Sequence, residues 1–471
     1  MKKIITLLFI SVTLMFSQKV DFDEYFIDKT LRIDVAHSGT KSQEYFSIKN
    51  IYEYPIWSGN KNSLIDNRNL GEYMIKVYDE KNGNLIFSYG YCALFNEWQS
   101  TDEALNGIFK TIDESFLIPY PKESIKIIVA RRNKKMTFDD IATFNIDPKQ
   151  PIINREKRDY DYTINNFMIN GNPSKKVDLV ILAEGYSKED IPKFRKDVER
   201  FTNTLFGKSP FKERKTDFNV YAIESYSEKS GIDNPRRNVW KNTPFSLTYN
   251  SLGSQRYIVT EENKTLRDVA GMVPYDAIII LVNDSEYGGG GIFNLYSTCY
   301  TISSNPDLDW QCDYVFVHEF GHSFGGLGDE YYSSDVPYND IYPEDVDPWE
   351  PNISRILDKN NLKWKDMIKK DVPVPTPWGK ETYDQLGKDM QKLDRTSPDY
   401  AINRAKLAEQ QKKLMESQKY GKNVGYFEGS GYSSKDLYRP FIDCTMFSLS
   451  LVGFDPVCTK AIERNIDYYT K

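Results

Sequence analysis

Apolar and polar positions alternate, in part, along five short segments in the first third of the chain. These segments are rich in β-branched and aromatic residues, which is typical of strands with one buried face. Asn82-Gly83 lies between two of them and is a strong β-hairpin signal. We therefore predict an all-β sandwich domain over residues 18–153. Its five predicted strands are 30–35, 44–48, 73–78, 85–89 and 125–130.

The pattern changes after a polar, charged stretch at 154–162, which we interpret as a linker. Residues 188–205 have the apolar spacing of an amphipathic helix. The neighbouring apolar runs are typical of buried strands, and they lie at 177–183, 218–223 and 277–282. Strands that alternate with helices predict an α/β domain around a mostly parallel sheet, here over residues 160–471.

Four consecutive glycines occupy residues 288–291. They lack the spacing of a phosphate-binding loop. We interpret them as a flexible turn that leads into an edge strand at 295–302, to which an extended substrate peptide could add as a further strand. A plain loop is the alternative.

The stretch from 334 to about 440 is irregular and rich in Pro, Trp and Asp. One surface helix is predicted within it, at 399–419, and its many Lys, Glu and Gln residues indicate a solvated face. The acidic segment 335–350 offers hard oxygen ligands of the kind that calcium prefers. It has no EF-hand pattern, so a solvated acidic loop is the alternative to a calcium site.

Residues 1–17 resemble an export signal. Lys2 and Lys3 precede an apolar run at 4–16 that is too short to cross a bilayer comfortably. We expect a secreted, periplasmic or cell-surface protein without a membrane span in the mature chain, and an N-terminal anchor is the alternative. Loss of Lys2 and Lys3 changes the formal charge from −7 to −9, which argues against nucleic acid as a partner.

Five cysteines are too few for a disulfide scaffold, and their odd number leaves at least one without a partner in the chain. In an oxidising compartment, Cys444 with Cys458 or Cys299 with Cys312 could close short loops, and the sequence does not decide between thiols and disulfides. The fifth cysteine is Cys92.

Only three histidines occur among 471 residues, and two of them, His318 and His322, are four positions apart. Residues at this spacing share one face of a helix, so both imidazoles can bind one metal ion. Glu319 lies next to the first ligand, where it can reach a water molecule beside the metal. The surrounding segment is largely apolar and uncharged, which predicts a metal-binding helix in the protein core.

A catalytic zinc ion needs a third protein ligand. The remaining histidine, His37, belongs to the predicted β domain, and Gly328 occupies the position where many related sites have their third histidine. The third ligand is therefore predicted to be an oxygen. Asp329 is preferred because it is nearest in register to the turn, and Glu330 is the alternative.

The string HEFGHSFGGLGDEYY, from His318 to Tyr332, resembles the IgA-peptidase family of metallopeptidases (M64). The segments 178–186, 230–233, 437–440 and 444–446 agree with this resemblance. It implies a zincin-like (metzincin-like) α/β catalytic domain with a single zinc ion and endopeptidase activity. By the same resemblance, His318, His322 and Asp329 are zinc ligands, Glu319 is the catalytic carboxylate, and Met446 lies in a methionine turn beneath the metal.

We therefore predict a secreted zinc-dependent endopeptidase that acts on an extended polypeptide, with host glycoproteins among the candidate substrates. Two other classes of protein remain as alternatives. One is a secreted adhesion module whose zinc is structural and closed by a fourth ligand such as Cys312. The other is a zinc hydrolase of non-peptide bonds.

Overall fold

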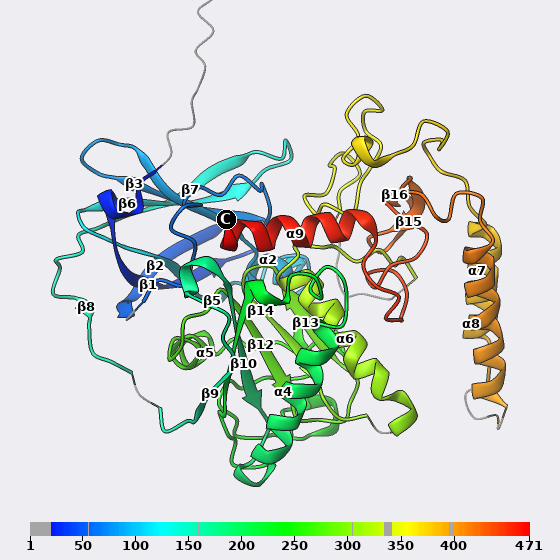
Figure 1. Ribbon diagram of the computed structural model, residues 1–471, viewed down its shortest axis with the longest axis horizontal. Coiled ribbons are helices and arrows are strands. Elements are labelled where there is room, and N and C mark those ends of the chain that lie inside the picture. The colour runs from blue at the N-terminus through cyan, green and yellow to red at the C-terminus, as the bar shows by residue number, and fades with distance from the viewer. Residues whose placement is uncertain are drawn as a thin grey trace, which may run out of the picture.

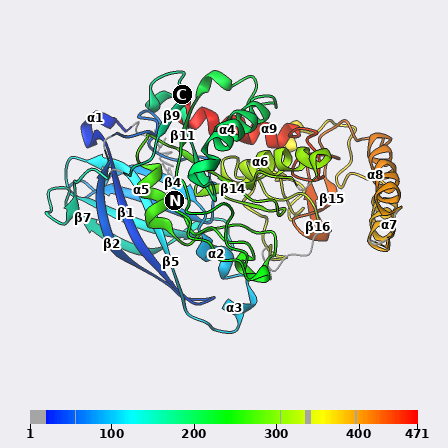
Figure 2. The ribbon, with the colours of Figure 1, turned by 90° about the horizontal axis from the view of Figure 1, so that it is seen from below.

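The computed structural model describes residues 20–471 except 55, 159, 304, 334–341, 395–396 and 398. The predicted signal peptide, residues 1–17, lies outside this range, as does the first half of the candidate calcium segment, 335–341. The β-rich N-terminal region and the α/β region lie side by side, and a pair of helices projects from the far end (Figures 1 and 2).

Two four-stranded sheets build the N-terminal region, with the orders β5-β1-β2-β8 and β4-β3-β6-β7. All five predicted strands are present. The hairpin at Asn82-Gly83 is confirmed, because the antiparallel strands β3 and β4 flank it and Gly83 has a φ of 73°. The strands are β1 (Phe26–Gly39), β2 (Glu44–Tyr54), β3 (Tyr73–Asp79), β4 (Leu85–Tyr91), β5 (Lys110–Pro121), β6 (Ile125–Arg132), β7 (Phe138–Ile146) and β8 (Ile153–Asn154). The short helices are α1 (Phe22–Tyr25), α2 (Leu94–Trp98) and α3 (Asp102–Leu105).

A six-stranded sheet with the order β13-β14-β12-β10-β11-β9 forms the centre of the second region. Its four inner strands are parallel, as predicted, while the two outer strands are antiparallel to their neighbours. The strands are β9 (Ile164–Met168), β10 (Val177–Glu184), β11 (Phe218–Ile223), β12 (Ala277–Val282), β13 (Gly289–Ile292) and β14 (Tyr296–Tyr300). The helices are α4 (Ile191–Leu205), α5 (Asn263–Ala270) and α6 (Asp309–Ser323).

The predicted edge strand at 295–302 is wrong in its position. Its core, β14, lies inside the sheet, and the glycines themselves form the edge strand β13. The reason is the close approach of helix α6: a Cβ atom on Gly291 would lie 2.3 Å from the carbonyl oxygen of Glu319, and one on Gly289 would lie 2.6 Å from Val315. Glycine is therefore present for packing against the helix, not for flexibility.

The C-terminal segment contributes the helical pair α7 (Lys380–Gln391) and α8 (Tyr400–Glu416), the hairpin β15 (Phe427–Ser430) and β16 (Ser433–Arg439), and helix α9 (Pro456–Thr470). The surface helix predicted at 399–419 is α8, and α7 was not predicted. In the part of the chain that the structure describes, no helix is long and apolar enough to cross a membrane.

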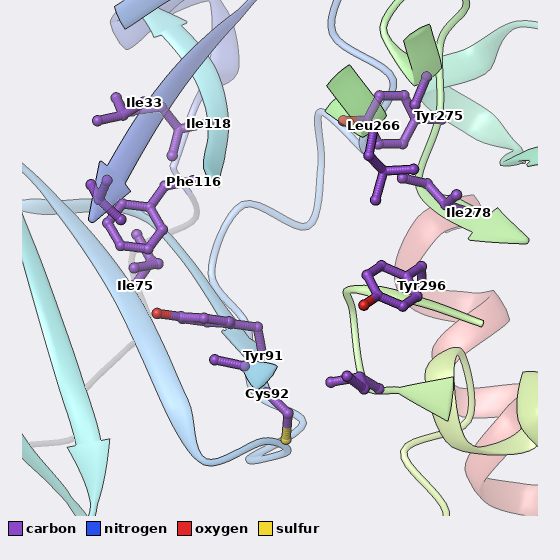
Figure 3. Close-up of a cluster of buried hydrophobic side chains, with 14 of the residues drawn as sticks. Ile33, Ile75, Tyr91, Cys92, Phe116, Ile118, Leu266, Tyr275, Ile278 and Tyr296 are labelled. Atoms are coloured by element: carbon purple, nitrogen blue, oxygen red, sulfur yellow. The ribbon is translucent and has the colours of Figure 1, made fainter. Parts of the chain in front are cut away.

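One continuous hydrophobic core connects the two regions (Figure 3). Phe116 and Tyr91 enter it from the N-terminal sheets, and Leu266, Ile278 and Tyr296 enter it from the α/β region. Backbone hydrogen bonds also cross between the regions, for example from the Cys92 amide to the Phe293 carbonyl at 3.0 Å. The N-terminal region therefore holds the edge of the central sheet in place.

Candidate metal centre

Helix α6 is buried along most of its circumference, which explains its nearly uncharged sequence. It packs against strands β13 and β14 on one side and against the segment around Met446 on another. At Gly321 a Cβ atom would lie 2.9 Å from the sulfur of Met446, so a larger residue would force the Met446 side chain to move. Met446 is fully buried against the helix. The helix is thereby fixed at the turn that carries both histidines.

Three side-chain atoms meet at one point beside this helix. Nε2 of His318 lies 3.1 Å from Nε2 of His322. Oδ1 of Asp329 lies 3.1 Å from the first of these nitrogens and 3.2 Å from the second. The three predicted ligands therefore form a nearly equilateral triangle, which is the geometry of a group that could hold one metal ion.

The outer nitrogen of each imidazole lies against a backbone carbonyl. Nδ1 of His322 lies 2.6 Å from the Leu327 carbonyl oxygen, and Nδ1 of His318 lies 3.1 Å from that of Thr445. A carbonyl only accepts, so each Nδ1 donates its hydrogen there and each Nε2 keeps a lone pair. These lone pairs face a carboxylate oxygen that is buried without a hydrogen-bond donor. A cation satisfies all three atoms at once.

The spacing also fits zinc. Zinc–nitrogen distances of about 2.0–2.1 Å in a tetrahedral site place neighbouring ligand atoms about 3.3 Å apart. The observed separations of 3.1–3.2 Å are close to this value. Burial lowers the pKa of His322, but the Asp329 carboxylate outweighs burial and brings this pKa to about 9, so without a metal ion a proton on Nε2 takes the place that the cation would occupy. The pocket is thus electrostatically prepared for positive charge.

A tight turn between β15 and β16 holds Asp329 from its other side. Gly431 and Tyr432 occupy this turn, both with positive φ (53° and 62°), as a two-residue hairpin turn of type I′ requires. The Gly431 amide donates to the carbonyl of Asp329 at 2.9 Å, and the Tyr432 amide donates to that of Tyr331 at 3.0 Å. The Tyr432 hydroxyl donates to Oδ2 of Asp329. Oδ1 is thereby turned toward the histidines.

The alternative ligand Glu330 faces the opposite way. Its Oε1 accepts hydrogen bonds from Asn352 at 2.9 Å and from the Cys458 thiol at 3.2 Å. Its backbone amide donates to the Met446 carbonyl at 2.8 Å, which fixes this orientation. The geometry therefore brings Asp329, and not Glu330, to the two histidines.

Comparison with known protein families identifies the family of this chain. Residues 166–466 match the model described as IgA Peptidase M64. The chain belongs to the IgA peptidase M64 family. Residues 21–143 match the Peptidase M64 N-terminus as well. A search of curated proteins found no match. Membership in M64 implies metallopeptidase activity, and hence a metal ion and a protein substrate.

A large cavity of about 2360 Å³ opens over the metal centre of this M64 protein. His318, Glu319, His322 and Asp329 all line it. Its walls also include Arg131 and Arg132 from strand β6 and Arg404 and Lys412 from helix α8. The N-terminal region, the central sheet edge and the projecting helices thus enclose one continuous space. Such a space can accommodate an extended polypeptide.

Glu319, next to His318 in the chain, also lines this cavity and is not one of the three clustered residues. Burial raises its pKa above the ordinary value of a glutamate, and the two imidazoles lower it in part. A carboxylate whose pKa is raised toward neutrality is a suitable general base.

Several residues around the M64 centre were not predicted from the sequence. Tyr432 is the most important, and Tyr314 also contributes, with its hydroxyl 3.1 Å from Nδ1 of His318. No sequence motif identifies either tyrosine as part of the site. His37 is fully buried in the N-terminal sheet, where its two ring nitrogens lie against the carboxylates of Glu44 and Glu114. These contacts indicate a structural role for His37.

Proposed function

We propose that this M64 protein is a secreted zinc-dependent endopeptidase. The supporting observation is the meeting of three lone-pair-bearing atoms, from His318, His322 and Asp329, within 3.2 Å of one another beside a large cavity. The M64 family implies a metal, and the donor set of two imidazoles and one carboxylate suits zinc. Three protein ligands leave one coordination position for chemistry.

The chain supplies a base and a binding surface for peptide hydrolysis. Zinc in such a site acidifies water and polarises a carbonyl group. Glu319 would take the proton of the attacking water and pass it to the leaving amine. An extended substrate would pair with the sheet at Gly291, which lines the cavity. At the other end of strand β13, Gly289 already pairs in this way with the chain itself. Its backbone forms hydrogen bonds of 3.1 Å with the segment 256–258.

A structural zinc site would need a fourth protein ligand. Among the described residues, the group around His318 contains only three. Cys312, the fourth ligand of the structural alternative, does not belong to this group. These observations favour an open, catalytic site over the adhesion module.

Glu319→Gln tests the proposal. It keeps the shape of the side chain but removes its basicity, so peptide cleavage should fall by about 10²–10⁴-fold while the zinc content stays equal to that of the unchanged protein. The exposed Glu189→Gln serves as the matched control and should leave both quantities unchanged. If Glu319→Gln retained most of the activity, Glu319 would not be the base.

The natural substrate is to be identified by digestion. The family name refers to immunoglobulin A, so host glycoproteins of this kind come first, together with mucins and dietary proteins. The purified protein is incubated with this panel and with small-molecule esters, and the new fragment termini are sequenced. Cleavage of esters with no protein fragmented would favour the non-peptide hydrolase.

A further inference from the structure

A second cluster of side chains that could bind a metal ion lies next to the candidate metal centre. It consists of Glu330, Cys444, Asp455 and Cys458, whose ligand atoms all lie within 4.8 Å of one another. Glu330 and both cysteines have no exposed surface, and Asp455 is 3% exposed. None of these residues lines the large cavity. The cluster is therefore separate from the centre of the proposed function.

Each carboxylate of this cluster is held by one oxygen and leaves the other free. Oδ1 of Asp455 caps helix α9, where it accepts from the amides of Val457 and Cys458 at 2.6 and 3.0 Å. Oε1 of Glu330 accepts from Asn352 and from Cys458. The second oxygens, Oε2 of Glu330 and Oδ2 of Asp455, are buried without a hydrogen-bond donor among the described residues. Such orphaned oxygens are costly unless a cation or a proton satisfies them.

The two sulfur atoms have the separation of zinc ligands. Sγ of Cys444 lies 3.8 Å from Sγ of Cys458. Zinc–sulfur distances of about 2.3 Å in a tetrahedron place two sulfurs about 3.8 Å apart, whereas a disulfide requires about 2.05 Å. Both cysteines are free thiols in this structure.

Burial raises the pKa of both thiols, that of Cys444 to about 12, so the thiolates form only together with a bound cation. Cys458 lies in the first turn of the 15-residue helix α9, with Asp455 as its N-cap. The positive end of the helix dipole stabilises negative charge at this position. The buried guanidinium of Arg439 interacts electrostatically with Glu330 and offsets part of the negative charge.

We propose that Glu330, Cys444, Asp455 and Cys458 bind a second, structural zinc ion. Four protein ligands close such a site to substrate. Binding would release the protons of both thiols and the proton that the buried Glu330 holds beside Asp455, and would form two zinc–sulfur and two zinc–oxygen bonds. The ion would join the residue after Asp329 to the methionine turn and to helix α9. Since the Thr445 carbonyl orients His318, this ion would brace the catalytic centre.

Metal analysis of the full chain tests the proposal. The unchanged protein should contain about two zinc ions per chain, and both the Cys444→Ser/Cys458→Ser and the His318→Ala/His322→Ala variants about one each. Cys299→Ser, a buried cysteine outside both groups, is the matched control and should keep both ions. After cobalt substitution, the His318→Ala/His322→Ala variant should retain a thiolate-to-cobalt charge-transfer band.

Two results would overturn the proposal, and neither needs the cysteine variants to fold. The first is an unreduced intact mass two hydrogens lower than the thiol form, with the bond mapped to Cys444 and Cys458. The second is complete loss of zinc from the His318→Ala/His322→Ala variant while its circular dichroism stays unchanged. Loss of peptidase activity alone would concern the catalytic centre, so failure of the proposed function is distinguishable from failure of this site.

Discussion

Replacing Tyr432 with phenylalanine deletes the hydroxyl that donates to Oδ2 of Asp329 and changes little else. The ring keeps its contact with Tyr331, at 5.5 Å between centroids. The positive φ of residue 432 is equally unfavourable for both side chains, so backbone strain cancels. Asp329 is 6% exposed, and water can replace the lost donor only poorly. A hydrogen bond to a charged group contributes about 1.5–3 kcal/mol, so Tyr432→Phe should weaken zinc binding by about 10–100-fold.

Competition with a chelator measures this affinity, and initial rates at saturating zinc separate a loss of metal from a loss of catalysis. Tyr314→Phe is the matched control. Its hydroxyl also lies beside a ligand, His318, but the Thr445 carbonyl still orients that ring. We expect less than about a threefold change in the zinc affinity of this control. Equal zinc affinity in Tyr432→Phe and the unchanged protein would refute the role of Tyr432 in holding Asp329.

Two further predictions concern packing and pH. Gly291→Ala should lower the free energy of unfolding, measured by urea titration, by about 1–3 kcal/mol and should reduce activity, because its new methyl group would collide with helix α6 at Glu319 and His322. Gly387→Ala, on the exposed helix α7, is the control and should be neutral or stabilising in the same titration. Burial raises the pKa of Glu184 to about 7, so the folded chain holds a proton that the unfolded chain releases above about pH 4.5. This contribution to the free energy of unfolding is complete below about pH 4.5, and about 3 kcal/mol of it is lost as the pH rises through 7. In Glu184→Gln the free energy of unfolding should therefore fall less steeply over this pH range. The same dependence on pH in the variant and the unchanged protein would contradict this prediction.

A simple burial pattern made strand β10 predictable from the sequence, whereas strands β5 and β13 have features that hid them. Strand β10 is buried along its whole length, so its apolar run identifies it. Strand β5 escaped prediction because a buried position holds Glu114, which pairs with His37 at 2.6 Å. Strand β13 escaped because glycines, usually signs of turns, were required by the helix packed against them.

The metal ligands follow a different rule. The spacing of His318 and His322 on one helix identifies these two residues, whereas Asp329, in the turn after it, was predicted from its register and from the family resemblance, with Glu330 as the alternative. Tyr432 and the Thr445 carbonyl reach the same centre from more than a hundred residues away, through a hairpin turn and a buried loop. No local pattern encodes such contacts. The orientation of the ligands, in contrast to their identity, is a property of the tertiary fold.

Because the two regions share one core, the linker between them does not separate two independent hydrophobic cores. Tyr91 and Phe116 on one side pack in the same cluster as Ile278 and Tyr296 on the other. A fragment that ends at the linker would present this apolar face to water, and such faces promote aggregation. The metal centre lies in the second region, but the edge strand beside it is anchored through Phe293 to the first. The two matched segments of the chain therefore share one core, and the loss of either would expose the apolar face of the other.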